Sequence, residues 1–170
     1  MAGSPRFGEV LRTDLLARYP DAARWGPLRV AAAFLVDPSL RAVLTIRLAL
    51  RSGDRMLFIC RAWTVARLRS EVFRCEIGPG LQLPHPFGVV IAPGTFLGRN
   101  VTLHHSVTLG YARAPRPQER LPTPSVEDGV EIHPGSVVVG DITIGPGACI
   151  GPGSVVSRDV APGAVVTAAG

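Results

Sequence analysis

The chain has 170 residues, of which 46% are hydrophobic, enough for one or two small domains with a buried core. Its basic residues are 18 arginines and no lysine, and the formal net charge is +5. Most of the arginines are spread singly through apolar stretches of residues 1–74, without a basic stripe or interleaved aromatic residues. This pattern favours solvated helix faces and argues against binding to nucleic acid or to an anionic membrane.

The longest purely apolar run, residues 30–36, is far too short to cross a bilayer, and nothing resembles a signal peptide. Cys60, Cys75 and Cys149 form no CxxC pair, and an odd number of cysteines is typical of reduced thiols. A cytoplasmic protein is therefore expected.

Four helices are predicted before the first repeat. Residues 7–18 form a short amphipathic pattern, and Pro27 can open a second helix. That helix stops before Asp37-Pro38, where Asp37 caps the third helix and Pro38 occupies its first helical position. Asp54 caps the fourth, which is apolar on nearly all sides. We expect this last helix to be buried or to contact another subunit.

From Ile77 onward the sequence repeats every six residues. A hexapeptide period is the signature of a parallel β-helix, in which each hexad makes one short strand and one turn. The aliphatic residue points into the core, and Gly, Pro or Asn supplies the turn. The sequence predicts a helical domain over residues 1–69 and a β-helix domain over residues 70–170. The aliphatic positions are Ile91, Leu97, Leu103 and Leu109 in one register, and Val126, Ile132, Val138, Ile144, Ile150 and Val156 in a second.

Three hexads complete one triangular coil, so residues about 18 apart stack roughly 4.8 Å apart, as neighbouring strands do. The step from Leu83 to Leu103 is 20, because Val89-Val90 is expected to add two residues. Outward imidazoles on such a stack cannot be core residues, and packing does not require them. With that step allowed, the third positions of four stacked hexads form an outward ladder of His85, His105, Pro134 and Pro152.

Residues 111–125 cannot form hexads and are expected to leave the prism as a loop beside the histidine turn. Exposed histidines flanked by such a loop are the best candidate site in the sequence, and His85 is the strongest functional candidate. For His133 an inert surface residue is favoured, and for His104 both interpretations stay open.

No other catalytic motif competes with the histidines. A Gly-rich phosphate loop, HExxH, GxSxG and a Cys/His set at zinc spacing are all absent from the sequence. The stacked His85 and His105 could bind a metal, but no carboxylate occupies an equivalent position in the neighbouring coils, so no metal is expected.

The sequence resembles the serine O-acetyltransferases, a branch of the hexapeptide acyltransferases, over most of its length. The resemblance implies a left-handed β-helix that assembles as a homotrimer, with acetyl-CoA in the groove between adjacent prisms. A dimer of trimers through the helix of residues 54–69 is a weaker expectation. The matching blocks are Tyr19-Pro-Asp-Ala, Pro27-Leu28 and Ile46-Arg-Leu-Ala in the helical part, then residues 77–91, Ser106-Val-Thr-Leu-Gly and Gly151-Pro-Gly-Ser-Val-Val in the coils.

Position by position, the resemblance puts His85 on the catalytic base. It puts Gly110, Pro134 and Pro152 on turns that line the coenzyme A groove. A neutral imidazole can take a hydroxyl proton near pH 7 while the hydroxyl oxygen attacks the acetyl thioester. Cys75 has no evident base beside it, which favours direct transfer over an acyl-enzyme.

Three more residues are candidates for the same site. Glu71 or a backbone carbonyl is expected to orient His85. His105 assists His85 or contacts the acceptor, or is only a polar turn residue. Arg120 holds a carboxylate or a phosphate of coenzyme A in bidentate fashion, or belongs to a solvated loop with incidental charge.

Two departures from the family pattern keep the acceptor open. The family usually has aspartate just before its base, where this chain has Pro84, and a second site histidine for which this chain offers no match. Acetyl transfer to serine or a serine-like amino acid is the first expectation. The lost histidine favours a sugar or natural-product hydroxyl as acceptor, and Pro84 favours a catalytically inactive assembly subunit.

Overall fold

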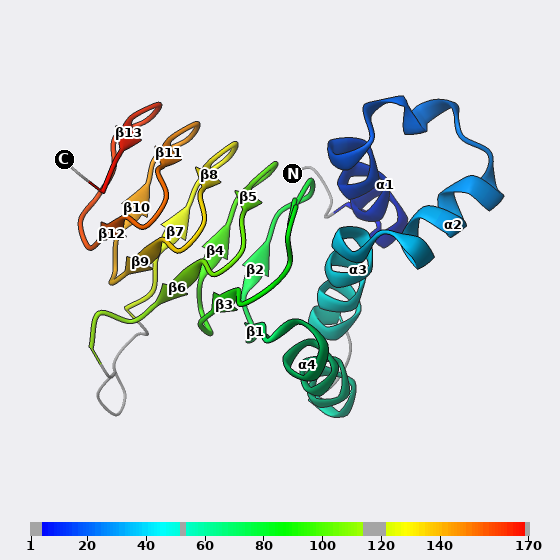
Figure 1. The fold of residues 1–170 in the computed structure, drawn as a ribbon, viewed down its shortest axis with the longest axis horizontal. Coiled ribbons are helices and arrows are strands. Elements are labelled where there is room, and N and C mark those ends of the chain that lie inside the picture. Colours follow the sequence, from blue (N-terminus) through cyan, green and yellow to red (C-terminus); the bar gives the residue numbers. More distant parts are fainter. Residues whose placement is uncertain (1–4, 52–53, 114–121, 169–170) are drawn as a thin grey trace.

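The computed structural model describes residues 5–51, 54–113 and 122–168. Helices gather at one end of the molecule, and a stack of short strands runs away from them toward the C-terminus (Figure 1). The four predicted α-helices are confirmed, and a short 3₁₀ helix follows the first. They are α1 (Phe7–Arg18), η1 (Pro20–Arg24), α2 (Pro27–Val36), α3 (Pro38–Arg51) and α4 (Asp54–Leu68).

The corner between α2 and α3 is set by an aspartate cap. The Asp37 carboxylate accepts hydrogen bonds from the backbone N–H groups of Ser39 at 2.7 Å and Leu40 at 3.3 Å. These donors have no partner inside the helix, so the side chain stabilises its start. Pro38 suits the first helical position because it has no N–H to satisfy. The predicted helix boundary is confirmed.

The strands form three parallel sheets, which are ordered β1-β3-β6-β9-β12, β10-β7-β4-β2 and β13-β11-β8-β5. Successive strands belong to different sheets, so the chain winds around three faces as a parallel β-helix. The strands are β1 (Glu71–Val72), β2 (Glu76–Ile77), β3 (Val90–Ile91), β4 (Phe96–Leu97), β5 (Thr102–Leu103), β6 (Thr108–Gly110), β7 (Ser125–Val126), β8 (Glu131–Ile132), β9 (Val137–Val139), β10 (Thr143–Ile144), β11 (Cys149–Ile150), β12 (Val155–Val156) and β13 (Val165–Val166).

The predicted coil length is confirmed by the strand register. Ser125 pairs with Thr143, a step of 18 residues. Thr108 pairs with Val137, a step of 29, because the segment between β6 and β7 adds eleven residues without shifting the register. A loop was expected in this segment, and residues 114–121 of it lie outside the described residues.

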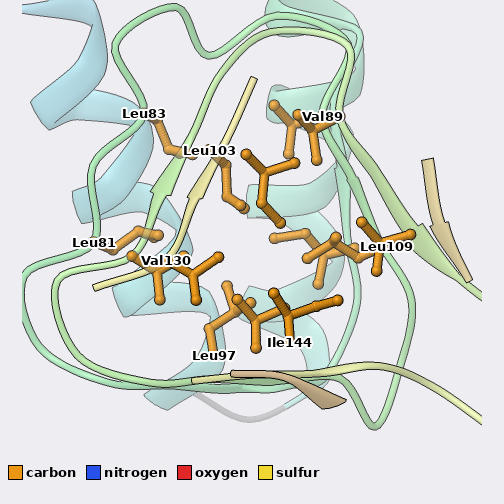
Figure 2. Packing of buried hydrophobic residues seen from close by; sticks show 14 of the residues in the cluster. Leu81, Leu83, Val89, Leu97, Leu103, Leu109, Val130 and Ile144 are labelled. Atoms are coloured by element: carbon orange, nitrogen blue, oxygen red, sulfur yellow. The ribbon is translucent and has the colours of Figure 1, made fainter. Parts of the chain in front are cut away.

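The core runs along the inside of the coils. The aliphatic residue of each predicted hexad from Ile91 to Ile150 is completely buried, and Val156 is 3% exposed. Figure 2 shows Leu97, Leu103 and Leu109 projecting into the space that the coils enclose. The same cluster continues into Val43 of α3, so the helices close the end of the prism.

One arginine contradicts the expectation of solvated helix faces. Arg47 of α3 is only 6% exposed, and its guanidinium donates to the fully buried Asp14 carboxylate of α1 at 2.9 and 3.0 Å. It also donates to the carbonyls of Ile77 and Gly78, each at 2.6 Å. Arg47 therefore joins both helices to the first coil, a role that its spacing in the sequence does not reveal.

The outer surface of α4 carries large apolar side chains. Phe58 is 73% exposed and Ile59 is 55% exposed. This helix was expected to be buried or to contact another subunit. Burial within the chain is wrong for these two residues. Across residues 5–51, 54–113 and 122–168, no helix combines the length and apolar character that a membrane span requires.

Candidate active site

His85 lies in a widened turn of the first coil. Gln82 pairs with Thr102 and Val90 pairs with Thr108, so this turn spans two residues more than the turn of the next coil. The two extra residues were predicted to be Val89-Val90. The register places them before Val89 instead, because Val89 is 2% exposed and packs in the core.

The structure brings His85 and His105 together. Both side chains are exposed, and their ring centroids lie 6.0 Å apart at an interplanar angle of 74°. The stack continues through backbone hydrogen bonds, from Gly135 N–H to the His105 carbonyl at 3.1 Å and from Gly153 N–H to the Pro134 carbonyl at 2.9 Å. His105, Pro134 and Pro152 therefore form one outward row of turns, as predicted. In the widened first turn the next place in this row belongs to Phe87, because Ser106 N–H donates to the Phe87 carbonyl at 2.8 Å. The predicted backbone position of His85 in the ladder is therefore wrong, although its ring lies beside that of His105.

A cavity of about 850 Å³ separates the His85 turn from the helices. Pro84 and Phe87 line it from the β-helix, and residues of α1, η1, α2 and α3 line it from the other side. Its charged residues were not predicted, because local sequence patterns do not tell which helical side chains face the first coil. These charged residues have both signs and are Arg18, Asp21, Arg29 and Asp37.

Asp37 supplies a fixed negative charge to the cavity. The Tyr19 hydroxyl donates to its Oδ2 at 2.6 Å, and Arg18 Nε lies 3.4 Å from the same oxygen. Burial alone would raise the pKa of Asp37. Hydrogen bonds from Tyr19 and from the backbone N–H groups of Leu40 and Ser39 outweigh burial and hold that pKa below its usual value. The cap of α3 is thus also an acidic wall of the cavity.

Trp25 positions the other two charges. Its Nε1 donates to Asp21 Oδ2 at 3.0 Å, and the Arg29 guanidinium carbon lies 4.1 Å from the centroid of its ring system. A cation over an indole face is attracted by the ring quadrupole. One indole therefore holds a carboxylate and a guanidinium at the same cavity. The only sequence signal for this pair was the Tyr19-Pro-Asp-Ala block, which contains Asp21.

Two serines fix the backbone on either side of His85. The Ser39 hydroxyl of α3 donates to the Pro84 carbonyl at 3.1 Å, and the Ser70 hydroxyl donates to the Pro86 carbonyl at 2.9 Å. Ser70 lies one residue before Glu71, and its hydroxyl holds in place the turn that carries His85.

The remaining predicted residues lie elsewhere. Glu71 is in β1, in register with Val90 of the five-stranded sheet. Gly110 was expected in a turn, and that expectation is wrong. Gly110 is the last residue of β6 and is buried, because it still pairs with Val139. Arg120 lies outside the described residues.

Cys75 is unsuited to carry an acyl group. Burial raises the pKa of its thiol to about 12, and the nearby charge of Arg47 lowers it by a smaller amount. The thiolate is the reactive form of cysteine, and almost none of it exists near neutral pH at such a pKa. This supports the expectation of direct transfer over an acyl-enzyme on Cys75.

The coils are those of a hexapeptide-repeat protein, and a family model described as "Bacterial transferase hexapeptide (six repeats)" matches residues 123–158. The serine acetyltransferase of Helicobacter pylori strain J99 is 31% identical over 145 residues, which cover 79% of this chain and 80% of that protein. The chain belongs to the serine acetyltransferase family.

Solved structures show the same fold. A serine acetyltransferase from Brucella abortus strain S19 in complex with coenzyme A superposes with a TM-score of 0.80 at 25% identity, covering 96% of this chain and 66% of that one. The Neisseria gonorrhoeae enzyme in complex with serine superposes with a TM-score of 0.74 at 27% identity, covering 93% and 65%. The chain spans only 30–51% of the length of other serine acetyltransferases that it matches.

Proposed function

We propose that this protein transfers an acetyl group from acetyl-CoA to the hydroxyl of serine or of a serine-like amino acid. The observation that carries this proposal is an exposed histidine, His85, beside a cavity lined by both carboxylates and guanidinium groups. A free amino acid carries one charge of each sign, and a sugar hydroxyl carries neither. The Neisseria enzyme bound to serine and the Brucella enzyme bound to coenzyme A support the same chemistry.

His85 acts as the general base. Its imidazole takes the proton of the acceptor hydroxyl, and the hydroxyl oxygen bonds to the acetyl carbonyl carbon. Acetyl-CoA supplies that carbonyl as a thioester, whose carbon–sulfur bond breaks. His85 then returns the proton to the departing sulfur, so the products are the acetyl ester and coenzyme A. His105 assists His85 or contacts the acceptor, and Glu71 remains a proposed orienting group.

Coenzyme A fits along the turn ladder above His85. Pro134 and Pro152 continue the row of turns and are partly or fully exposed. At Gly135 and Gly153 an added Cβ would meet nothing within 4 Å, so the surface beside both prolines is open to an extended ligand. We assign these turns and the Gly110 end of β6 to the donor. Arg120 remains a proposed contact to a phosphate or a carboxylate.

Asp21 is the proposed partner of the acceptor's ammonium group. Asp37 already accepts four hydrogen bonds, from Tyr19, Arg18 and two backbone N–H groups. Asp21 accepts one from Trp25, at Oδ2, so its Oδ1 is the oxygen assigned to the ligand. Arg29 is the proposed partner of the acceptor's carboxylate, because its charge lies on the other side of the same indole.

The assay that tests this function follows coenzyme A release with L-serine as the acceptor. We expect saturable, serine-dependent release, and an Asp21→Asn variant whose KM for serine rises about tenfold or more while its KM for acetyl-CoA stays unchanged. Asp159→Asn, on a distant coil, is the matched control and should behave as the parent. Release with a sugar but not with serine would favour the sugar alternative. Coenzyme A binding without any release would favour the inactive subunit.

The proposal extends to assembly and location. Val90, Val137 and Val155 project outward from the five-stranded sheet, with Thr108 between Val90 and Val137, and Val155 is 73% exposed. Such an apolar strip suits an interface between copies, as in a left-handed, trimeric β-helix with domains at residues 1–69 and 70–170. A dimer of trimers through the exposed face of α4 is the larger form. Sedimentation of an active monomer would contradict the trimer.

Three free cysteines agree with a cytoplasmic location.

A further inference from the structure

A second group of chemically active side chains lies on the outer face of β5 and β8. His104 follows β5, and Glu131 and His133 lie in and after β8, which is adjacent to β5 in Figure 1. His104 Nε2 is 2.9 Å from Glu131 Oε1, and His133 Nε2 is 3.7 Å from the same oxygen. This cluster shares no residue with the acetyl-transfer site proposed above.

The coil register creates the cluster. Thr102 pairs with Glu131 and Leu103 with Ile132, so His104 and His133 occupy equivalent outward positions in neighbouring coils. Their rings stack at a centroid distance of 4.9 Å and an interplanar angle of 11°, close to the separation of adjacent strands. Glu131 lies two residues before His133 and projects from the same face, so its carboxylate reaches both rings. Backbone pairing therefore holds three donors on one surface.

The donors match the preferences of zinc. Zn²⁺ binds imidazole nitrogen and carboxylate oxygen, and two histidines with one glutamate leave a fourth position for water. Neighbouring ligand atoms around a tetrahedral zinc are roughly 3.4 Å apart, given metal–ligand bonds of about 2.0–2.2 Å. The two measured distances to Glu131 Oε1 lie on either side of this value, and the three ligand atoms are all within 4.8 Å of one another. Small side-chain rotations would therefore complete the geometry.

Partial burial also suits a metal. His104 is 20% exposed, His133 is 32% exposed and Glu131 is 46% exposed at their side chains. An ion can enter such a site from solvent, and a water molecule can occupy the open position. We propose that His104, Glu131 and His133 form a binding site for Zn²⁺ or a similar divalent transition metal. The expectation of no metal considered only the rung of His85 and His105, which lacks a carboxylate.

The test uses Zn²⁺ alone with chelator-treated full-length protein, in the absence of acetyl-CoA. Equilibrium dialysis should give one zinc per chain. His133→Gln and Glu131→Gln should each weaken zinc binding by about tenfold or more. Mutation of a residue that only orients a metal ligand typically costs 10–100-fold in metal affinity, so loss of a ligand itself should cost at least as much. His85→Gln removes another exposed histidine from a neighbouring turn, so it is the matched control and should bind zinc as the parent does.

A spectroscopic measurement on the unmutated protein removes dependence on variant folding. Co²⁺ bound in a four-coordinate site of this kind should give intense visible absorption at one equivalent, and added Zn²⁺ should abolish it. Three results would overturn the site: less than one zinc per chain, an unchanged zinc affinity in His133→Gln and Glu131→Gln, or an equal loss of zinc affinity in His85→Gln. In that case the cluster is a His–Glu hydrogen bond beside a stacked ring. Serine-dependent acetyl transfer is assayed separately, so either proposal can fail alone.

Discussion

Replacement of His85 by alanine is expected to lower kcat for acetyl transfer by about 10²–10⁴, the usual contribution of a general base. Alanine cannot take the acceptor's proton, and the exposed position of His85 means that no core packing is lost with the ring. The nearest imidazole in the ladder, that of His105, has its centroid 6.0 Å away, so it cannot replace His85 without moving. Steady-state kinetics with L-serine measure the loss.

Two controls separate chemistry from folding in this variant. Acetyl-CoA should bind with unchanged affinity in a calorimetric titration, because the proposed donor turns lie above His85. The unfolding midpoint should also be unchanged, because the turn backbone is held by Ser39 and Ser70. Near-normal turnover in His85→Ala would end the assignment of His85 as the base.

The coils were predictable because their physical rule is local. An inward residue every six positions dictates the strand, the turn and the stacking, so a buried residue such as Leu103 can be identified from spacing alone. The proximity of His85 to His105 follows from the same count, although Phe87 takes the backbone position that the count gave to His85. Helix boundaries were predictable for a similar reason, since Asp37 and Pro38 act on their own helix end.

The cavity was not predictable from the same rules. Asp21 and Arg29 become site candidates only because the helices dock against the His85 turn, and docking depends on contacts between residues far apart in sequence. The second cluster does follow from the coil register, which places His133 beside His104, but the expectation of no metal took only His85 and His105 into account. A periodic pattern gives the face of a residue, but it does not give the side chains that arrive from another element.

Breaking the buried Asp14–Arg47 pair is expected to have the largest effect on stability. Asp14→Ala should lower the free energy of unfolding by about 3–5 kcal/mol, because it leaves the Arg47 guanidinium buried without its counter-charge. It also removes the acceptor for the backbone N–H groups of Gly80 at 2.8 Å and Leu81 at 3.0 Å. Urea unfolding measures the change.

The matched experiment compares two arginines of the same helix. Arg47→Met should be strongly destabilising, whereas Arg41→Met, at an exposed position of α3, should change the unfolding midpoint little. Combining Asp14→Ala with Arg47→Met removes both charges, so the double variant should be more stable than the sum of the single losses predicts. Strict additivity would show that the pair is not coupled.

The same pair has a functional consequence. Arg47 donates to the carbonyls of Ile77 and Gly78, and Asp14 accepts from the next turn, so together they attach α1 and α3 to the coil that carries His85. Loosening this attachment should displace the helical wall of the cavity while leaving the coils intact. We therefore expect Arg47→Met, assayed below its unfolding transition, to raise KM for serine more than KM for acetyl-CoA. An equal rise in KM for serine and in KM for acetyl-CoA would contradict a specific role of the helices in the acceptor pocket.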